Sequence, residues 1–176
     1  MARQVKKAAI GKKPAAPAKP RKPRVKAIPD NYPRVCVTLR IGGAVEALQY
    51  YTRVFDGKVR LRLDMPDGRV GHSEIAIGKG LFMVSDEFPE MNMVGPVTIG
   101  QSSVTIQIYV KDVDETLVRA VKAGGRVIRP PQNEFYGDRS ALMEDPFGYV
   151  WMIQTHVEDV KPAEMKRRLA KMSALA

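Results

Sequence analysis

The chain contains the same succession of predicted elements twice, and corresponding residues lie 69 positions apart. In the first copy, residues 35–41 alternate apolar and polar side chains, which is the pattern of a half-buried strand. Residues 44–55 then carry apolar side chains at helical spacing, and Gly57 is expected to end this helix. Further strands are predicted at residues 59–63, 70–77 and 81–84.

The second copy begins with a strand at residues 104–110. Asp112 is predicted to cap the helix that follows, with Glu115 three residues later as in a capping box, and Gly124 is expected to close it together with the next glycine. Three more strands are predicted at residues 126–129, 139–144 and 149–154. The repeated order β-α-β-β-β predicts an α+β fold, in which two tandem modules form a curved mixed sheet or half-barrel with the helices outside.

The first strand of each predicted module has one apolar and one polar face. The apolar rows should pack beneath the helices, and they are Val35, Val37, Leu39 and Ile41 in the first copy and Val104, Ile106, Ile108 and Val110 in the second. The polar rows are Cys36, Thr38 and Arg40, and Thr105, Gln107 and Tyr109. Because both copies share this pattern, we expect the polar faces to form a ligand-holding cup; a face that meets solvent or a dimer partner is the alternative.

The formal net charge of +10 is concentrated at the N-terminus. Residues 1–30 hold ten Lys and Arg and one acid, whereas the remaining 146 residues hold 19 basic and 18 acidic side chains. Since Pro, Ala and Lys dominate residues 1–30, we expect a disordered basic arm there, a two-module domain over residues 31–160 and a short amphipathic helix within residues 161–176. The arm is interpreted as a solubilising tail, as a weak, salt-sensitive contact to nucleic acid or another polyanion, or as an organellar targeting peptide.

Cysteine content and hydropathy argue against several classes of protein. Cys36 is the single cysteine, which excludes an intrachain disulfide framework and is typical of a reducing, cytoplasmic location. No apolar run approaches the roughly 20 residues that a membrane-spanning helix needs, so no membrane is expected among the partners.

Several short segments carry a resemblance to a known family. They are Leu48-Gln49-Tyr50-Tyr51 with Val54-Phe55-Asp56-Gly57, Gly71-His72-Ser73-Glu74, Asp86-Glu87-Phe88-Pro89-Glu90, Tyr109-Val110-Lys111-Asp112-Val113-Asp114, Phe135-Tyr136-Gly137-Asp138-Arg139, Asp145-Pro146-Phe147-Gly148 and Thr155-His156-Val157-Glu158-Asp159. Together, in this order, they resemble the vicinal oxygen chelate superfamily, and within it the PhnB-like branch of the glyoxalase and bleomycin-resistance proteins. The resemblance covers about residues 33–172 and implies a homodimer. It does not imply one reaction, because one fold hosts many chemistries.

Enzymes of this superfamily usually hold a divalent metal with His and Glu ligands from the first and last strand of each module. The resemblance places those ligands at Cys36, Met83, Thr105 and Met152 of this chain. None of these residues is the imidazole or carboxylate that such a metal needs. We therefore predict that the usual metal site is absent and that no cofactor is bound.

Other polar residues are candidates for the site itself. His72 and Glu74 share one face of a predicted strand and are a candidate acid/base pair, with a hydrogen-bonded structural pair as the alternative. The candidate ligand-pocket residues are Arg40, Thr105, Gln107, Tyr109, Tyr136, Asp138 and Arg139.

These observations predict a small-molecule binding protein of the glyoxalase and bleomycin-resistance type, without the usual metal. One alternative is an enzyme of the same superfamily, of lyase, isomerase or dioxygenase type, with displaced active-site residues. A second alternative is a nucleic-acid-associated protein that acts through its basic N-terminal arm.

Overall fold

The computed structural model describes residues 25–173 and divides the chain into two units between Asn31 and Tyr32. Most of the predicted basic arm, residues 1–24, lies outside the described residues, as do residues 174–176. In the first unit, the Lys26 ammonium lies 2.6 Å from the Asp30 carboxylate, and both side chains are exposed. Such an exposed pair contributes little to stability.

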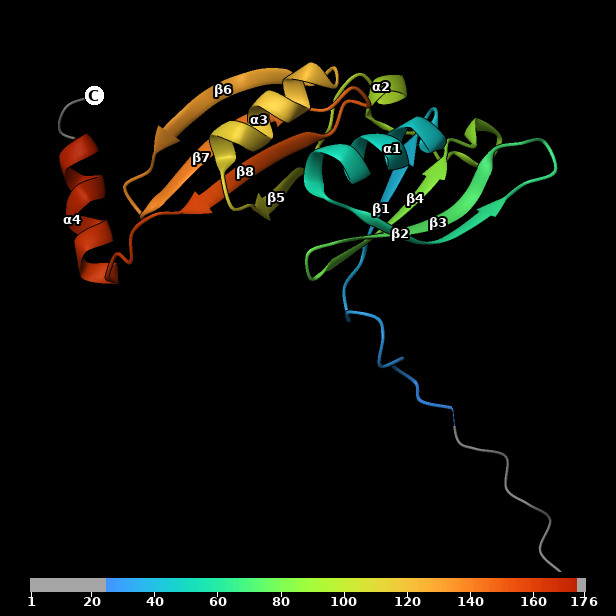
Figure 1. The fold of residues 1–176 in the computed structure, drawn as a ribbon, viewed down its shortest axis with the longest axis horizontal. Helices are drawn as coiled ribbons and strands as arrows, with labels where there is room; N and C mark the ends of the chain where they lie inside the picture. The colour runs from blue at the N-terminus through green and yellow to red at the C-terminus, as the bar shows by residue number, and fades with distance from the viewer. Residues whose placement is uncertain (1–24, 174–176) are drawn as a thin grey trace, which may run out of the picture. The chain divides into compact units, whose positions relative to one another are not determined.

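The first module of the second unit is a four-stranded sheet with a helix on one face (Figure 1). Its strand order is β1-β4-β3-β2, with β1 parallel to β4 and the other neighbours antiparallel. The elements are β1 (Val37–Ile41), α1 (Ala44–Phe55), β2 (Lys58–Asp64), β3 (Val70–Ile77) and β4 (Gly80–Asp86). The predicted order of elements in this module is confirmed, and each strand other than β3 shifts its ends by one or two residues.

The second module repeats this topology in a second sheet, of order β5-β8-β7-β6. Val37 lies opposite Phe82 in the first module, and 69 residues further along Ile106 lies opposite Trp151. The modules therefore form two four-stranded mixed sheets, and the predicted α+β fold is confirmed. The elements are β5 (Thr105–Tyr109), α3 (Val113–Lys122), β6 (Arg126–Asn133), β7 (Asp138–Glu144) and β8 (Val150–His156).

Three further elements lie outside the repeat. A 3-10 turn, η1 (Pro89–Met91), and a short helix, α2 (Pro96–Ile99), connect the modules, and neither was predicted. Helix α4 (Pro162–Ser173) follows the second module, as predicted from the spacing of its apolar residues. None of the helices in residues 25–173 combines the length and the apolar character needed to cross a membrane.

The ends of the two long helices differ in part from the prediction. Asp112 caps α3, since its carboxylate accepts the Glu115 N–H at 2.9 Å, whereas the Glu115 carboxylate binds Arg119 instead of closing a capping box. Helix α1 ends at Asp56, which adopts the left-handed conformation with φ of 54°. Gly57 is therefore not the C-cap. It is required because a Cβ at this position would lie 3.0 Å from the Tyr51 carbonyl oxygen.

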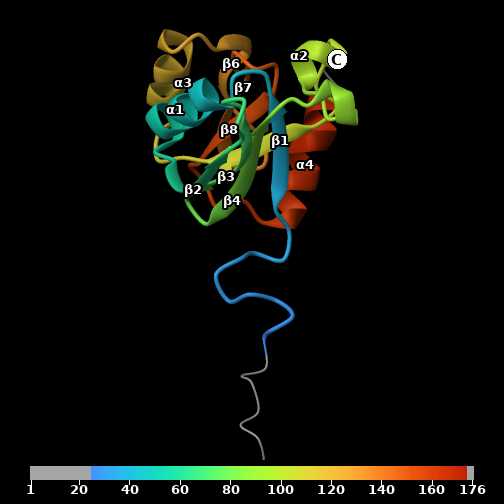
Figure 2. The same cartoon turned by 90° about the vertical axis from the view of Figure 1, so that its right-hand side faces the viewer.

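The apolar rows of the first strands are buried only in part. Leu39, Ile41 and Ile106 are buried beneath the helices, but Val35 is 82% and Val104 53% exposed. The prediction was wrong for these outer positions because both precede the regular strands, which begin one or two residues later. Helices α1 and α3 cover the same side of the two sheets and lie side by side (Figures 1 and 2).

Aromatic residues join the two modules into one core. The Phe55 ring of α1 lies 4.6 Å from the Trp151 ring of β8, and the Tyr51 ring lies 5.4 Å from it, measured between centroids. Trp151 is fully buried. Its indole N–H and the Tyr51 hydroxyl both donate to the buried Asp145 carboxylate, at 2.8 and 2.7 Å. Burial raises the pKa of Asp145, and these donors oppose that shift by stabilising the carboxylate.

Candidate functional site

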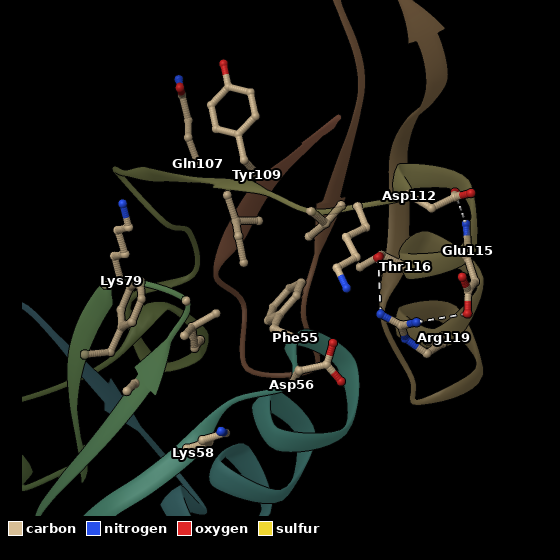
Figure 3. Close-up of a pocket in the computed structure, with 18 residues that line it drawn as sticks. Phe55, Asp56, Lys58, Lys79, Gln107, Tyr109, Asp112, Glu115, Thr116 and Arg119 are labelled. Carbon is tan, nitrogen blue, oxygen red and sulfur yellow. Dashed lines mark hydrogen bonds and ion pairs between the residues drawn. The ribbon is translucent and has the colours of Figure 1, made fainter. Parts of the chain in front are cut away.

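A cleft of about 880 Å³ lies between the two modules, where β5 faces the end of α1 and the turn that joins β3 to β4. Phe55 lies in the middle of the cleft, with Lys58 and Lys79 on one side and the first turns of α3 on the other (Figure 3). Phe82 and Ile108 add apolar surface. A cleft of this volume with an apolar interior and a polar rim is typical of a site for a small organic molecule.

The rim of the cleft carries charged groups of both signs. Arg119 binds the Glu115 carboxylate at 3.1 Å and donates to the Val54 carbonyl oxygen, so its charge is partly neutralised within the protein. The Lys58, Lys79 and Lys111 ammonium groups form no ion pair with any residue in the described part of the chain. These lysines are therefore available to polar groups of a bound molecule.

Two of the predicted ligand-pocket residues, Gln107 and Tyr109, line this cleft from β5. Both side chains extend away from Phe55, toward the sheet face opposite the helices (Figure 3). Tyr109 donates its hydroxyl to the buried Asp138 carboxylate at 2.7 Å, and this hydrogen bond raises the pKa of the Tyr109 hydroxyl. Thr105, two residues before Gln107, is exposed and does not line the cleft.

A polar cluster surrounds Asp138 on this sheet face. His156 Nδ1 lies 2.7 Å from one Asp138 oxygen, and its Nε2 lies 3.0 Å from Asp159. The hydrogen bond to Asp138, and after it the one to Asp159, raises the pKa of His156 above its ordinary 6.5. Tyr136 lies beside the cluster, with its hydroxyl 3.5 Å from the Gln154 side-chain oxygen. The sequence did not single out His156 as part of the site, because the contact depends on the pairing of β7 with β8.

Arg139 is not part of that cluster. Its guanidinium makes two hydrogen bonds of 2.7 Å to Asp114 on α3, on the helix-covered side of the sheet. Neighbouring residues of a strand point to opposite faces, so Asp138 and Arg139 are separated by the sheet. The predicted grouping of Tyr136, Asp138 and Arg139 therefore holds only for the first two residues.

The predicted pair His72 and Glu74 lies on the corresponding face of the first sheet. His72 Nε2 is 3.6 Å from the Glu74 carboxylate, which is buried and also accepts a hydrogen bond from Tyr32. Arg60 lies 3.9 Å from the same carboxylate. Arg40 is on this face as well, where its guanidinium binds Ser85. None of these residues lines the cleft.

The four positions at which the resemblance implies metal ligands carry no imidazole or carboxylate group. Met83 is paired with Thr38 across β1 and β4, and Met152 with Gln107 across β5 and β8. Cys36 directly precedes β1, and Thr105 is the first residue of β5. Thioether, thiol and hydroxyl groups do not fit a divalent metal that prefers imidazole and carboxylate ligands. Among residues 25–173, no group of three or more His, Cys, Asp and Glu side chains is suitably placed to hold a metal ion.

Comparisons with known proteins agree with this architecture. Residues 35–153 match the family model of the Glyoxalase/Bleomycin resistance protein/Dioxygenase superfamily. Uncharacterized proteins of Mycobacterium bovis and Mycobacterium tuberculosis are 30% identical over 141 residues, which is 78% of this chain and 93% and 83% of theirs.

Solved structures show the same fold. TioX from Micromonospora sp. ML1 is 25% identical with a TM-score of 0.55, covering 72% of this chain and 100% of its own. The PhnB protein from Bacillus cereus is 16% identical with a TM-score of 0.57, covering 70% and 99%. The repeat, the paired sheets and the family match lead to one conclusion: this chain belongs to the Glyoxalase/Bleomycin resistance protein/Dioxygenase superfamily.

Proposed function

We propose that this protein binds a small organic molecule in the cleft between its two modules, without a metal ion. The observation that carries the proposal is the cleft itself, with about 880 Å³ of space, apolar surface from Phe55 and Phe82, and lysines at its rim. The apolar surface favours burial of a hydrocarbon or aromatic body, and the polar rim fixes its orientation. The side chains at the family's metal positions support the metal-free part of the proposal.

A thermal-shift screen of small organic molecules tests the binding. A ligand present at 100 times its Kd stabilises the folded protein by about 2.7 kcal/mol, so hits are readily seen. For each hit, amide chemical shifts locate the site. We expect changes at residues 78–80 and 107–111 and none along α4, which serves as the internal control. Hits that leave the cleft amides unchanged would contradict the proposal.

Metal analysis tests the second half of the proposal. We expect the purified protein to contain well below one equivalent of Ni, Zn, Mn or Fe, and we expect a chelator to leave the ligand-induced stabilisation unchanged. A stoichiometric metal that is needed for binding would instead favour an enzyme of the same superfamily.

A further inference from the structure

The repeat creates two boundaries between the modules, which we call seams. At each seam the edge strand of one module faces the start of the last strand of the other module. At the first seam, a tyrosine fills the space beside the edge strand β1. Tyr149, directly before β8, accepts a hydrogen bond from the Arg40 N–H at 2.9 Å and donates one to the Arg40 carbonyl oxygen at 3.2 Å. Tyr149 is buried, and its hydroxyl forms hydrogen bonds to the backbone N–H and C=O of Arg40 at the outer edge of β1. A phenol is thus the group that this fold uses to close a seam.

The residue that corresponds to Tyr149 in the first module is Gly80. In the ladder of β7 and β8, Val150 lies opposite Glu144, and in the ladder of β3 and β4, Leu81 lies opposite Ala76. Tyr149 directly precedes Val150, and Gly80 directly precedes Leu81, so Tyr149 and Gly80 hold equivalent positions. The residue that corresponds to Arg40 is Tyr109, 69 positions along the chain.

The second seam therefore lacks its phenol, and the cleft lies there. Gly80 and the backbone of Tyr109 both line it. Val110 donates its N–H to the Gln154 carbonyl oxygen at 2.8 Å, so Tyr109, one residue earlier, directs its own N–H and C=O away from β8. Because β5 is an edge strand, these two groups face the cleft. They repeat the donor and acceptor that Arg40 presents to Tyr149.

We propose that the cleft binds a phenolic aromatic compound, whose ring takes the place that Tyr149 takes at the other seam and whose hydroxyl bonds the Tyr109 N–H and C=O. This inference rests on the proposed function and adds the class of ligand. Phe82 and Phe55 supply aromatic surface for the ring. The remaining volume admits substituents larger than one ring, and Lys79 and Lys111 can meet polar groups on them.

A matched pair of fluorescent probes tests whether the hydroxyl group of the ligand contributes to binding. We expect 2-naphthol to bind the full chain about three- to tenfold more tightly than 2-methoxynaphthalene, which has the same rings but no donor, because the ether leaves the Tyr109 carbonyl oxygen unpaired. The Tyr109 amide resonance should shift with 2-naphthol. Equal affinity for both probes would overturn the phenol assignment, while the cleft would remain a ligand site.

A substitution that introduces a tyrosine at the second seam tests where the phenol binds. A Cβ at Gly80 would lie 3.4 Å from the Ile77 carbonyl oxygen and 3.5 Å from the Phe82 ring, which is ordinary contact, so Gly80→Tyr should fold. We expect Gly80→Tyr to weaken 2-naphthol binding at least tenfold and the control Gly80→Ala to bind as the wild type does. Unchanged binding by Gly80→Tyr would overturn the inference.

The reciprocal variant gives a test that does not depend on Gly80. Tyr149→Gly opens the first seam, so 2-naphthol should stabilise this variant against heat more than it stabilises the wild type, by replacing the lost side chain. An equal or smaller stabilisation would count against a phenol as the closing group. If neither probe binds the wild type while other molecules bind in the cleft, the phenol inference fails and the proposed function stands; if nothing binds there, both fail.

Discussion

Tyr50 and Tyr51 are adjacent on α1, and both are buried, yet their hydroxyl groups have opposite surroundings. The Tyr51 hydroxyl donates to Asp145 at 2.7 Å, whereas the Tyr50 hydroxyl has no hydrogen-bond partner in the described part of the chain. Burial, and after it the Asp145 charge, raises the pKa of the Tyr50 hydroxyl. An unsatisfied buried hydroxyl costs about 1–3 kcal/mol, which other contacts of α1 must offset.

This pair predicts opposite effects of the same chemical change. Tyr50→Phe should raise the free energy of unfolding by about 1 kcal/mol, because it removes a polar group that has no partner. Tyr51→Phe should lower it by about 1–3 kcal/mol, because Asp145 loses a donor while remaining buried. Urea denaturation of both variants measures the difference. Similar losses in both would show that the Tyr50 hydroxyl has a partner, such as a buried water.

At the scale of elements, His156 at the end of β8 binds two carboxylates. One is Asp138 at the start of β7, and the other is Asp159 in the segment that leads to α4. The pKa of His156 is raised in the folded protein, so protonated His156 stabilises the fold. This contribution is complete below the ordinary pKa of 6.5 and is lost as the pH rises through the higher folded value. An NMR titration of the imidazole should therefore give a pKa above 6.5, and Asp138→Asn should lower it. A value at or below 6.5 in the wild type would contradict the hydrogen bond to Asp138.

Arg168 of helix α4 contacts the residues that precede the helix. This side chain binds Glu158 at 2.6 Å and Glu164 at 2.9 Å, and it donates to the Phe135 carbonyl oxygen. The neighbouring Arg167 binds Glu164, within the same helix. We expect Arg168→Gln to speed hydrogen exchange along residues 162–172 by about three- to tenfold and Arg167→Gln to change it little. Equal effects would show that the helix is held by other contacts.

At the scale of the whole molecule, the sheet faces opposite the helices are open in a single chain. Leu61 and Leu63 lie opposite Glu74 and His72 on this face, and both leucines are exposed, as is Tyr109. A second copy of the chain would bury this apolar surface, in line with the homodimer that the family resemblance implies.

Light scattering tests this expectation directly. One chain has a mass of 19.6 kDa, and we expect a value about twice as large in solution. Leu63→Lys should shift the equilibrium toward single chains by placing a charge in the interface, whereas Val118→Lys, an exposed position on α3, should not. A mass of one chain at all concentrations would contradict the dimer.

Much of the fold could be predicted from local patterns. The alternation around Leu39 and Ile106 and the cap at Asp112 depend on neighbouring residues alone, so the strands and the helix start were found near their true positions. The C-cap at Asp56 was missed because a glycine such as Gly57 is the more usual residue at a helix end. Gly57 instead allows close packing against Tyr51. The candidate site was predicted less well, because the face to which Arg139 points depends on where β7 begins.

By itself, the sequence determined the two modules and their order of strands and helices, because the repeat of 69 residues encodes these in local periodicity. The resemblance to the family rested instead on short motifs along the chain. It also contains the difference between the seams, since Tyr149 has Gly80 as its counterpart. Only the tertiary structure decided that Tyr149 closes on Arg40 and that the corresponding space beside Tyr109 remains a cleft. The physical reason is that both features arise from how one module packs against the other, and the Arg40–Tyr149 contact joins residues 109 positions apart.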